Sequence, residues 1–154
     1  MREIGIAVIL GVLCGYPAQA QEALPPAISA SYDAELSVLQ SAKSRVDIHK
    51  MMESIDTPDW VDIAPTRERM SRDVVEQQLS AIVSVPPGDR PIPKHKIIYV
   101  GDLRSTVLVV YWTYRATARG LIGSIVRDTW IETSVGWRRS ISEKLFSDRI
   151  LTLP

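Results

Sequence analysis

The stretch from Ile122 to Phe146 constrains the fold of this chain more than any other segment. It holds two runs of β-branched and aromatic residues separated by residues 134–136, and Gly136 suits the positive φ of a tight turn. The pattern predicts a β-hairpin. Because side chains alternate across a strand, one set in the second strand is expected to face a core and the other to face water. The inward set is Trp137, Ile141 and Leu145, and the outward set is Arg138, Ser140, Ser142 and Lys144.

Two charged residues fall on the predicted core side of this second strand. Arg139 and Glu143 share the parity of Trp137 and Ile141, and a charge in a core is costly unless it is paired or hydrated in a cavity. They are four residues apart, about 13 Å along a strand, which is too far for a simple pair. Arg139 and Glu143 are therefore candidates for a ligand site. The alternative interpretation is two ordinary charges at the rim of a sheet.

The N-terminal segment has the layout of a secretory signal peptide. A short charged start, Met1–Glu3, precedes an apolar run, Ile4–Cys14, and Ala18–Ala20 provides a small-residue cleavage site. We expect residues 1–20 to be removed.

A lipid anchor on Cys14 and an uncleaved membrane anchor are the alternatives. The bulky Leu13 disfavours the lipid anchor. The apolar run is shorter than the roughly 20 residues of a spanning helix, so no stable membrane insertion is expected after cleavage.

The composition of the secreted chain limits its partners. Cleavage removes Cys14, the only cysteine, so stability must come from an ordinary core without disulfides. Lys and Arg (18) balance Asp and Glu (18), which argues against nucleic acid or an anionic membrane surface as a partner. Secretion without disulfides suits a bacterial periplasm, where we place the protein.

Helical patterns precede strand patterns along the chain. Residues 21–31 are expected to be a leader into a single domain of residues 32–154, with Ser31 capping the first helix. The patterns predict helices over 32–46, 48–54 and 72–83, and further strands over 60–63, 96–100 and 106–115, with a tail from residue 148 extending the last strand. This order predicts an α+β fold in which N-terminal helices pack on a strongly curved antiparallel sheet to form a cone.

The sequence VRDTWIETSVGWRRSISEKL, residues 126–145, resembles the closing hairpin of nuclear transport factor two-like proteins, also called SnoaL-like or cystatin-like cone proteins. Secreted members often carry Arg-Asp-Thr-Trp, a turn and Gly-Trp, as residues 127–130 and 136–137 do here. The resemblance implies the cone fold and a secreted protein of unassigned function. The superfamily includes isomerases, dehydratases, polyketide cyclases, oligomerisation domains and ligand binders, so the fold selects no activity.

The candidate ligand-binding residues are Asp128, Tyr111, Arg139, Trp130, Glu143 and His49. The resemblance places the face of Asp128 and Trp130 inside the cone, where a carboxylate can act as a general base and an indole can stack on a ligand ring. Tyr111 offers a hydroxyl donor, and the planar guanidinium of Arg139 can bind an anionic group. We expect Asp128, Tyr111 and Arg139 to line one cavity. The alternative interpretation is that Asp128 is a structural ion-pair partner and that Tyr111 only fills the core.

The two histidines carry weaker signals. His49 is a candidate general base with Asp47 as its orienting partner, although residues two apart on a helix do not face each other. His95, between Lys94 and Lys96, is expected to be a solvated surface residue. The sequence shows no metal-ligand spacing, phosphate loop or dinucleotide fingerprint, so no metal or cofactor is expected.

Two functions from different classes fit these patterns. The first is a domain that binds a small, partly apolar molecule or self-associates. The alternative is an acid–base enzyme of the isomerase, dehydratase or polyketide-cyclase type that uses the cone cavity, for which the sequence assigns no catalytic residue. A homodimer through the outer sheet face is expected, because helices can cover only one face and the strands carry large groups on both, among them Trp112, Tyr114 and Ile131.

The signal-peptide prediction has a direct test. When the full chain is expressed with export, the intact mass of the periplasmic protein should correspond to a chain that begins at Gln21, because cleavage follows Ala20. A retained N-terminus, or a lipid-modified Cys14, would contradict it.

Overall fold

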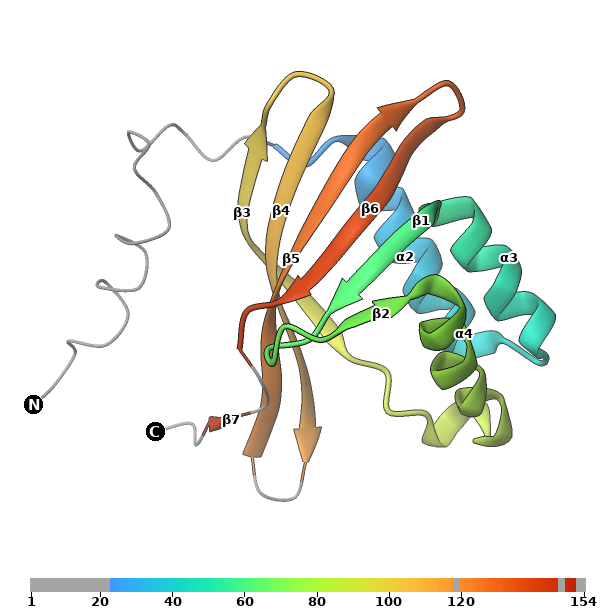
Figure 1. Ribbon diagram of the computed structural model, residues 1–154. Coiled ribbons are helices and arrows are strands. Elements are labelled where there is room, and N and C mark those ends of the chain that lie inside the picture. The colour runs from blue at the N-terminus through green and yellow to red at the C-terminus, as the bar shows by residue number, and fades with distance from the viewer. Residues whose placement is uncertain (1–22, 118–119, 147–148, 152–154) are drawn as a thin grey trace, which may run out of the picture.

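The structure is a computed structural model, and it describes residues 23–117, 120–146 and 149–151 (Figure 1). The predicted signal peptide, residues 1–20, lies outside the described residues, and its cleavage stays a prediction. Among the described helices, none is both long enough and apolar enough to cross a membrane.

The helices are α2 (Pro26–Ser41), α3 (Arg45–Ile55) and α4 (Arg72–Ser80), followed by the 3-10 helices η1 (Ala81–Ser84) and η2 (Pro87–Asp89). The first helix begins at Pro26 instead of Tyr32, so residues 26–31 of the predicted leader are helical. Proline is well suited to the first helical position, where its missing N–H would have no partner. This preference outweighs the cap expected at Ser31.

The predicted helix over residues 32–46 is divided in two at residues 42–44. Ser44 caps α3, and Asp47 accepts hydrogen bonds from the backbone N–H of Lys43 (2.8 Å) and Ser44 (3.0 Å). This reciprocal cap favours a new helix start over a continuous helix. Arg90 holds the end of α2 by donating to the carbonyl oxygens of Leu39 (2.9 Å) and Ala42 (2.7 Å).

The strands are β1 (Asp56–Ile63), β2 (Arg69–Ser71), β3 (Lys94–Asp102), β4 (Thr106–Thr117), β5 (Gly120–Thr133), β6 (Gly136–Lys144) and β7 (Arg149–Leu151). The sheet order is β2-β1-β6-β5-β4-β3, and β7 pairs with β5 instead of extending β6. The predicted antiparallel strands β3 to β6 are confirmed, and Gly136 has the expected positive φ of 104° in the β5–β6 turn. The sheet is mixed, because β1 runs parallel to β6.

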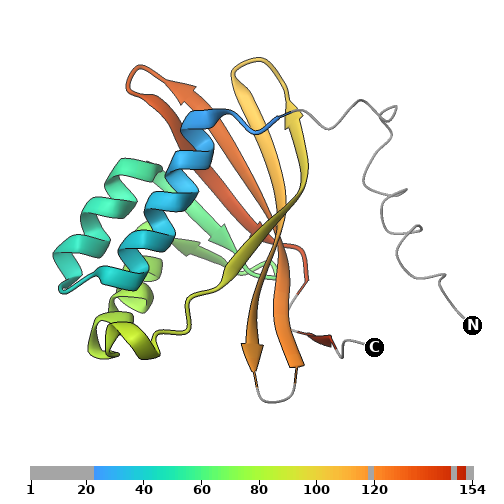
Figure 2. The ribbon, with the colours of Figure 1, turned by 180° about the vertical axis from the view of Figure 1, so that it is seen from behind.

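The helices lie on one side of the curved sheet, as Figure 2 shows from behind. The core between them is built from apolar side chains of α2, α3 and the inner faces of β1, β4 and β5, among them Ile28, Ile48, Met52, Val107, Val109 and Trp130. The predicted α+β cone fold is confirmed.

A β-bulge in β6 changes the predicted side-chain parity. Trp130 of β5 pairs with Arg139, but Thr129 pairs with Ile141, so Ser140 is an extra residue in the strand. Before the bulge, inward and outward residues alternate as predicted. After the bulge the assignment is reversed: Ser142 lies opposite the inward Asp128, and Ile141 and Glu143 lie on the outer face with Thr129 and Arg127. The prediction that Ile141 and Glu143 face the core is therefore wrong.

Candidate functional site

The inner face of the sheet holds a buried charged group centred on Arg139 of β6. Its Nε donates to Asp56 Oδ1 at 2.7 Å, and its Nη1 and Nη2 donate to the two carboxylate oxygens of Glu35 at 3.1 and 3.3 Å. Asp128 Oδ2 lies 3.6 Å from Nη1. The side chains of Asp56 and Asp128 are 0% exposed, and that of Arg139 is 6% exposed. One guanidinium thus contacts three carboxyl groups from three other elements, α2, β1 and β5.

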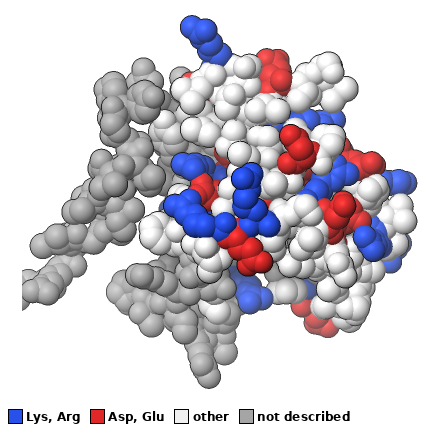
Figure 3. Space-filling view, viewed as in Figure 1, with Lys and Arg blue, Asp and Glu red and all other residues white. Residues whose placement is uncertain are grey.

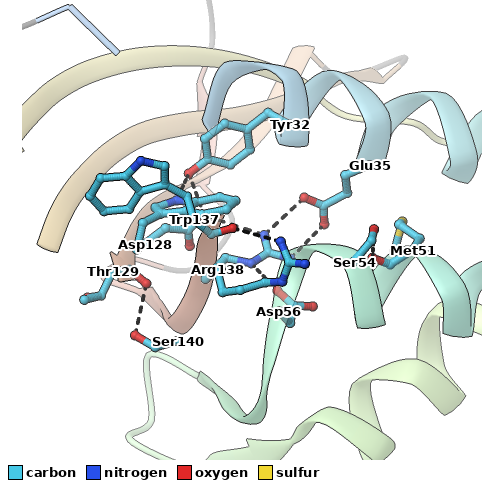
Figure 4. Close-up of polar contacts among 12 residues, drawn as sticks. Tyr32, Glu35, Met51, Ser54, Asp56, Asp128, Thr129, Trp137, Arg138 and Ser140 are labelled. Atoms are coloured by element: carbon cyan, nitrogen blue, oxygen red, sulfur yellow. Dashed lines mark hydrogen bonds and ion pairs between the residues drawn. The ribbon is translucent and has the colours of Figure 1, made fainter. Parts of the chain in front are cut away.

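A tyrosine on α2 joins Asp128 to Trp130. The Tyr32 hydroxyl donates to Asp128 Oδ2 at 2.7 Å and accepts a hydrogen bond from Trp130 Nε1 at 3.0 Å. Figure 4 shows Tyr32 and Glu35 projecting from α2 toward the sheet, where Asp128 and Asp56 lie. Tyr32 and Glu35 are three residues apart, so they share one face of the helix. We call Tyr32, Glu35, Asp56, Asp128, Trp130 and Arg139 the Arg139 cluster.

Aromatic rings enclose the Arg139 cluster. The Tyr32 ring packs edge-on against Tyr111, with centroids 5.3 Å apart, and against His95 at 5.9 Å. The Arg139 guanidinium lies 5.4 Å from the ring centroid of Trp60 and 5.9 Å from that of Trp130, within cation–π range. Water is thereby largely excluded from the charged groups.

Burial governs the protonation of the carboxyl groups. It raises the pKa of Asp56 to about 6, against the opposing effect of Arg139. The pKa of Asp128 is raised for the same reason. Burial alone would lower the pKa of Arg139, but the carboxylates of Glu35, Asp56 and Asp128 outweigh it and hold the guanidinium charged. Because carboxyl groups outnumber the guanidinium, the cluster favours keeping a proton on one of them.

The neighbouring titratable groups are neutral at neutral pH. Burial, reinforced by the Asp128 carboxylate, raises the pKa of Tyr32 and Tyr111 well above the ordinary tyrosine value. Burial lowers the pKa of His95. Several buried atoms of this region have no hydrogen-bond partner among the described residues: Asp56 Oδ2, Asp128 Oδ1, His95 Nδ1 and Ser142 Oγ. The Ser142 hydroxyl lies close enough to lower the pKa of Asp128, although its geometry falls short of a hydrogen bond.

The structure brings together four of the six candidate residues: Asp128, Trp130, Arg139 and Tyr111. The pockets of about 460 and 320 Å³ at the protein surface are lined by other residues, except that Asp56 of the cluster lines the second. Ligand binding by the four residues stays a prediction.

Glu143 and His49 lie elsewhere. The bulge places Glu143 on the outer face, where it pairs with Arg127 and with Arg67 Nη1 at 2.5 Å. His49 Nδ1 lies 2.8 Å from Glu76 Oε2, which raises the pKa of His49. The predicted pairing of His49 with Asp47 is wrong, because Asp47 caps α3 on another face of the helix.

Sequence reasoning missed four residues of this region: Tyr32, Glu35, Asp56 and His95. For Tyr32 and Glu35 the sequence did offer a signal, because residues three apart lie on one face of a helix. The prediction of a solvated His95 is wrong, because its register with Thr113 places it on the inner face beside Tyr111. Among the described residues, no group of three or more His, Cys, Asp or Glu side chains is arranged to hold a metal ion.

Two adjacent arginines provide a matched test of the Arg139 cluster. Arg139→Met should lower the free energy of unfolding by about 3–5 kcal/mol, because it leaves buried carboxylates without their cation. Arg138→Met should change it by less than about 1 kcal/mol, since within the described part of the chain Arg138 donates only to the backbone carbonyl of Trp137. Urea denaturation measures both. Equal effects of the two substitutions would contradict a stabilising role that is specific to Arg139.

The comparisons with known proteins concern the fold. No protein-family model matches the chain, and no curated protein matches it. Solved structures do: an NTF-2 like protein of unknown function from Silicibacter pomeroyi is 13% identical, with a TM-score of 0.54, over 80% of this chain and 93% of that one. A domain of unknown function with a cystatin-like fold from Nostoc punctiforme is 12% identical, with a TM-score of 0.58, over 82% of this chain and 77% of that one.

A third similar structure carries a functional description. It comes from Thiobacillus denitrificans and is described as a candidate calcium/calmodulin-dependent protein kinase type II association domain, with 18% identity and a TM-score of 0.56 over 80% of this chain and 97% of that one. Identities this low establish the fold and no activity. The chain has the cone-shaped α+β fold of the nuclear transport factor two-like and cystatin-like proteins.

Proposed function

We propose that this protein is a self-associating domain that forms a homodimer through the outer face of its sheet. The observation that carries the proposal is a group of large apolar side chains on that face, beside the ion pair of Arg127 and Glu143. The residues that the register places there include Leu108, Val110, Trp112, Tyr114, Ile125, Ile131 and Ile141. No described helix covers them (Figures 1 and 2).

The aromatic side chains of the outer face are held in fixed positions by their neighbours. The rings of Trp112 and Tyr114 are stacked with their centroids 4.3 Å apart. Trp112 also lies across Gly123, where an added Cβ would come within 2.4 Å of the indole nitrogen. Tyr99, on the neighbouring strand β3, is 38% exposed. Large rings held in this way provide contact area at a low cost in side-chain entropy.

The charge distribution favours a second copy of the chain as the partner. In Figure 3, charged side chains gather across the middle of the visible face, and the surface above them is mostly uncharged with a few scattered charges. The chain carries no net charge, so two copies do not repel each other over long distances. An isologous contact needs one self-complementary patch, which an apolar sheet face supplies. The similarity to a structure described as an association domain is consistent with this function. The predicted signal peptide supports a periplasmic location for this dimer.

Analytical ultracentrifugation tests the homodimer. The chain from Gln21 onward should sediment with twice the chain mass at micromolar concentration. Trp112→Glu should dissociate it, because a charge would be buried in the contact, whereas Val74→Glu, at an exposed position on α4, should leave it dimeric. A wild-type protein that is monomeric at about 100 µM would contradict the proposal, and this result does not depend on how the variants fold.

Acid–base chemistry on a small, partly apolar molecule in the cone is the second candidate function. One observation favours it: Asp128 is a buried carboxyl with a raised pKa that accepts from Tyr32 and lies near Tyr111, and the His95 ring packs against both tyrosines. A buried carboxyl with a raised pKa is a candidate for a general acid or base. The anion-binding role expected of Arg139 has less support, because Glu35 and Asp56 occupy its guanidinium.

Asp128→Asn separates a chemical role from a structural one. If Asp128 serves chemistry, the substitution should leave the melting temperature unchanged or raise it, because the amide keeps an acceptor for Tyr32 and removes an excess buried carboxyl. Differential scanning calorimetry measures the change. A fall of more than about 5 °C would identify Asp128 as a structural partner of Arg139 and remove the support for this second function.

A further inference from the structure

Helix α2 is joined to the sheet by polar side-chain contacts that all lie within the Arg139 cluster. In the described part of the chain, these contacts come from Tyr32 and Glu35. Tyr32 donates to Asp128 Oδ2 at 2.7 Å, and Glu35 accepts from Arg139 at 3.1 and 3.3 Å. Arg139 also binds Asp56 of β1. The attachment of α2 therefore involves three carboxyl groups around one guanidinium.

The cluster lacks positive charge when all of its carboxyl groups are ionised. Glu35, Asp56 and Asp128 then carry three negative charges against the single positive charge of Arg139. The side chains of Asp56 and Asp128 are 0% exposed and that of Glu35 is 14% exposed, so water screens their repulsion only weakly. Asp56 Oδ2 and Asp128 Oδ1 are also buried without a hydrogen-bond partner among the described residues. A neutral carboxyl group costs less than a carboxylate in such a position.

The neighbouring elements carry further ionisable groups: Tyr111 on β4, His95 on β3, Asp62 on β1, Lys144 on β6, Glu53 on α3 and Arg72 on α4. Burial keeps Tyr111 and His95 neutral at neutral pH. Lys144 lies 3.8 Å from Asp62, and Arg72 lies 4.0 Å from Glu53. Both of these cations thus have a carboxylate of their own, and Arg139 is the cation that the three carboxyl groups of the cluster have in common.

We propose that the contact of α2 with the sheet is pH-dependent: α2 is held firmly while the Arg139 cluster keeps a proton, and ionisation of all three carboxyl groups loosens α2 while the strands stay paired. The strands stay paired because their backbone hydrogen bonds do not involve the carboxyl groups. Loosening of α2 exposes Tyr32 and Asp128, which meet between the helix and the sheet (Figure 4). The contact lies on the inner face, so it does not require the homodimer.

Burial determines the sign of this pH dependence. In the folded protein the pKa of Asp56 is raised from 3.8 to about 6, and the pKa of Asp128 is raised too. A carboxyl group with a raised pKa contributes stability that is present at low pH and is lost as the pH rises through the folded-state value. For Asp56 alone, the equilibrium constant for opening should increase about tenfold between pH 5 and pH 8.

Hydrogen–deuterium exchange of the chain from Gln21 onward tests the proposal. Mass spectrometry at pH 5 and pH 8, at one protein concentration and with labelling times scaled to the intrinsic exchange rate, measures the protection of each element. We expect the amides of α2 to lose about tenfold in protection at pH 8, and those of the β5–β6 hairpin to lose less. Unchanged or greater protection of α2 at pH 8 would overturn the proposal. An equal loss in the hairpin would overturn it as well, because the whole fold would then respond.

A matched pair of substitutions on β1 assigns the change to the cluster. Asp56→Asn keeps an acceptor for the guanidinium and removes one carboxyl group, so the pH effect on α2 should fall below about threefold. Asp59→Asn removes the same charge from an exposed position on the same strand, so the tenfold change should remain. His49 and Asp62 also have raised pKa values, and both are intact in these variants. If Asp56→Asn keeps the full wild-type change, other groups cause it and the proposal is wrong.

Glu35→Gln provides a second test from the helix side, which does not depend on whether Asp56→Asn folds. Glu35 contributes to the raised pKa of Asp56. Its removal should therefore shift the ionisation of Asp56 to lower pH and reduce the change in α2 protection between pH 5 and pH 8. A wild-type change in this variant would contradict the role of the cluster.

Discussion

The charged contacts of Arg139 are the interaction on which the rest of the structure depends. From β6, this side chain reaches Glu35 on α2, Asp56 at the start of β1 and Asp128 on β5. It therefore fixes the helical layer and the parallel strand β1 relative to the central hairpin. The guanidinium offsets the cost of burying each carboxylate, and the carboxylates offset the cost of burying the guanidinium. Apolar packing alone would set these elements less specifically, since it has no direction.

The bulge at Ser140 separates two sets of charges. It leaves Arg139 on the inner face and moves Glu143 to the outer face, where Arg127 and Arg67 pair with it. In a strand of regular parity, Glu143 would point inward about 13 Å from Arg139, too far away to pair with its guanidinium. A buried carboxylate without its own cation is strongly disfavoured. One extra backbone residue thus allows a strand rich in charged residues to pair between β1 and β5.

The two faces of the sheet have different properties, and each suits a different role. The inner face is closed by aromatic rings around neutral tyrosines, a neutral histidine and carboxyl groups with raised pKa values. The outer face carries apolar side chains and stacked rings beside the ion pairs of Glu143, with no described helix above it. Between them, the rim holds a pocket of about 320 Å³ lined in part by Arg72 and Arg138.

The sequence by itself determined the order of helices and strands, the β5–β6 hairpin with its turn at Gly136, and the inward position of Asp128, Trp130 and Arg139. These features depend on local periodicity and turn chemistry, which neighbouring residues specify. Only the tertiary structure decided which groups meet Arg139, because Glu35 lies 104 positions away and its approach depends on how α2 packs. It also decided that Ser140 forms a bulge and that His95 faces inward, because a register is set by pairing with a distant strand and not by the local pattern.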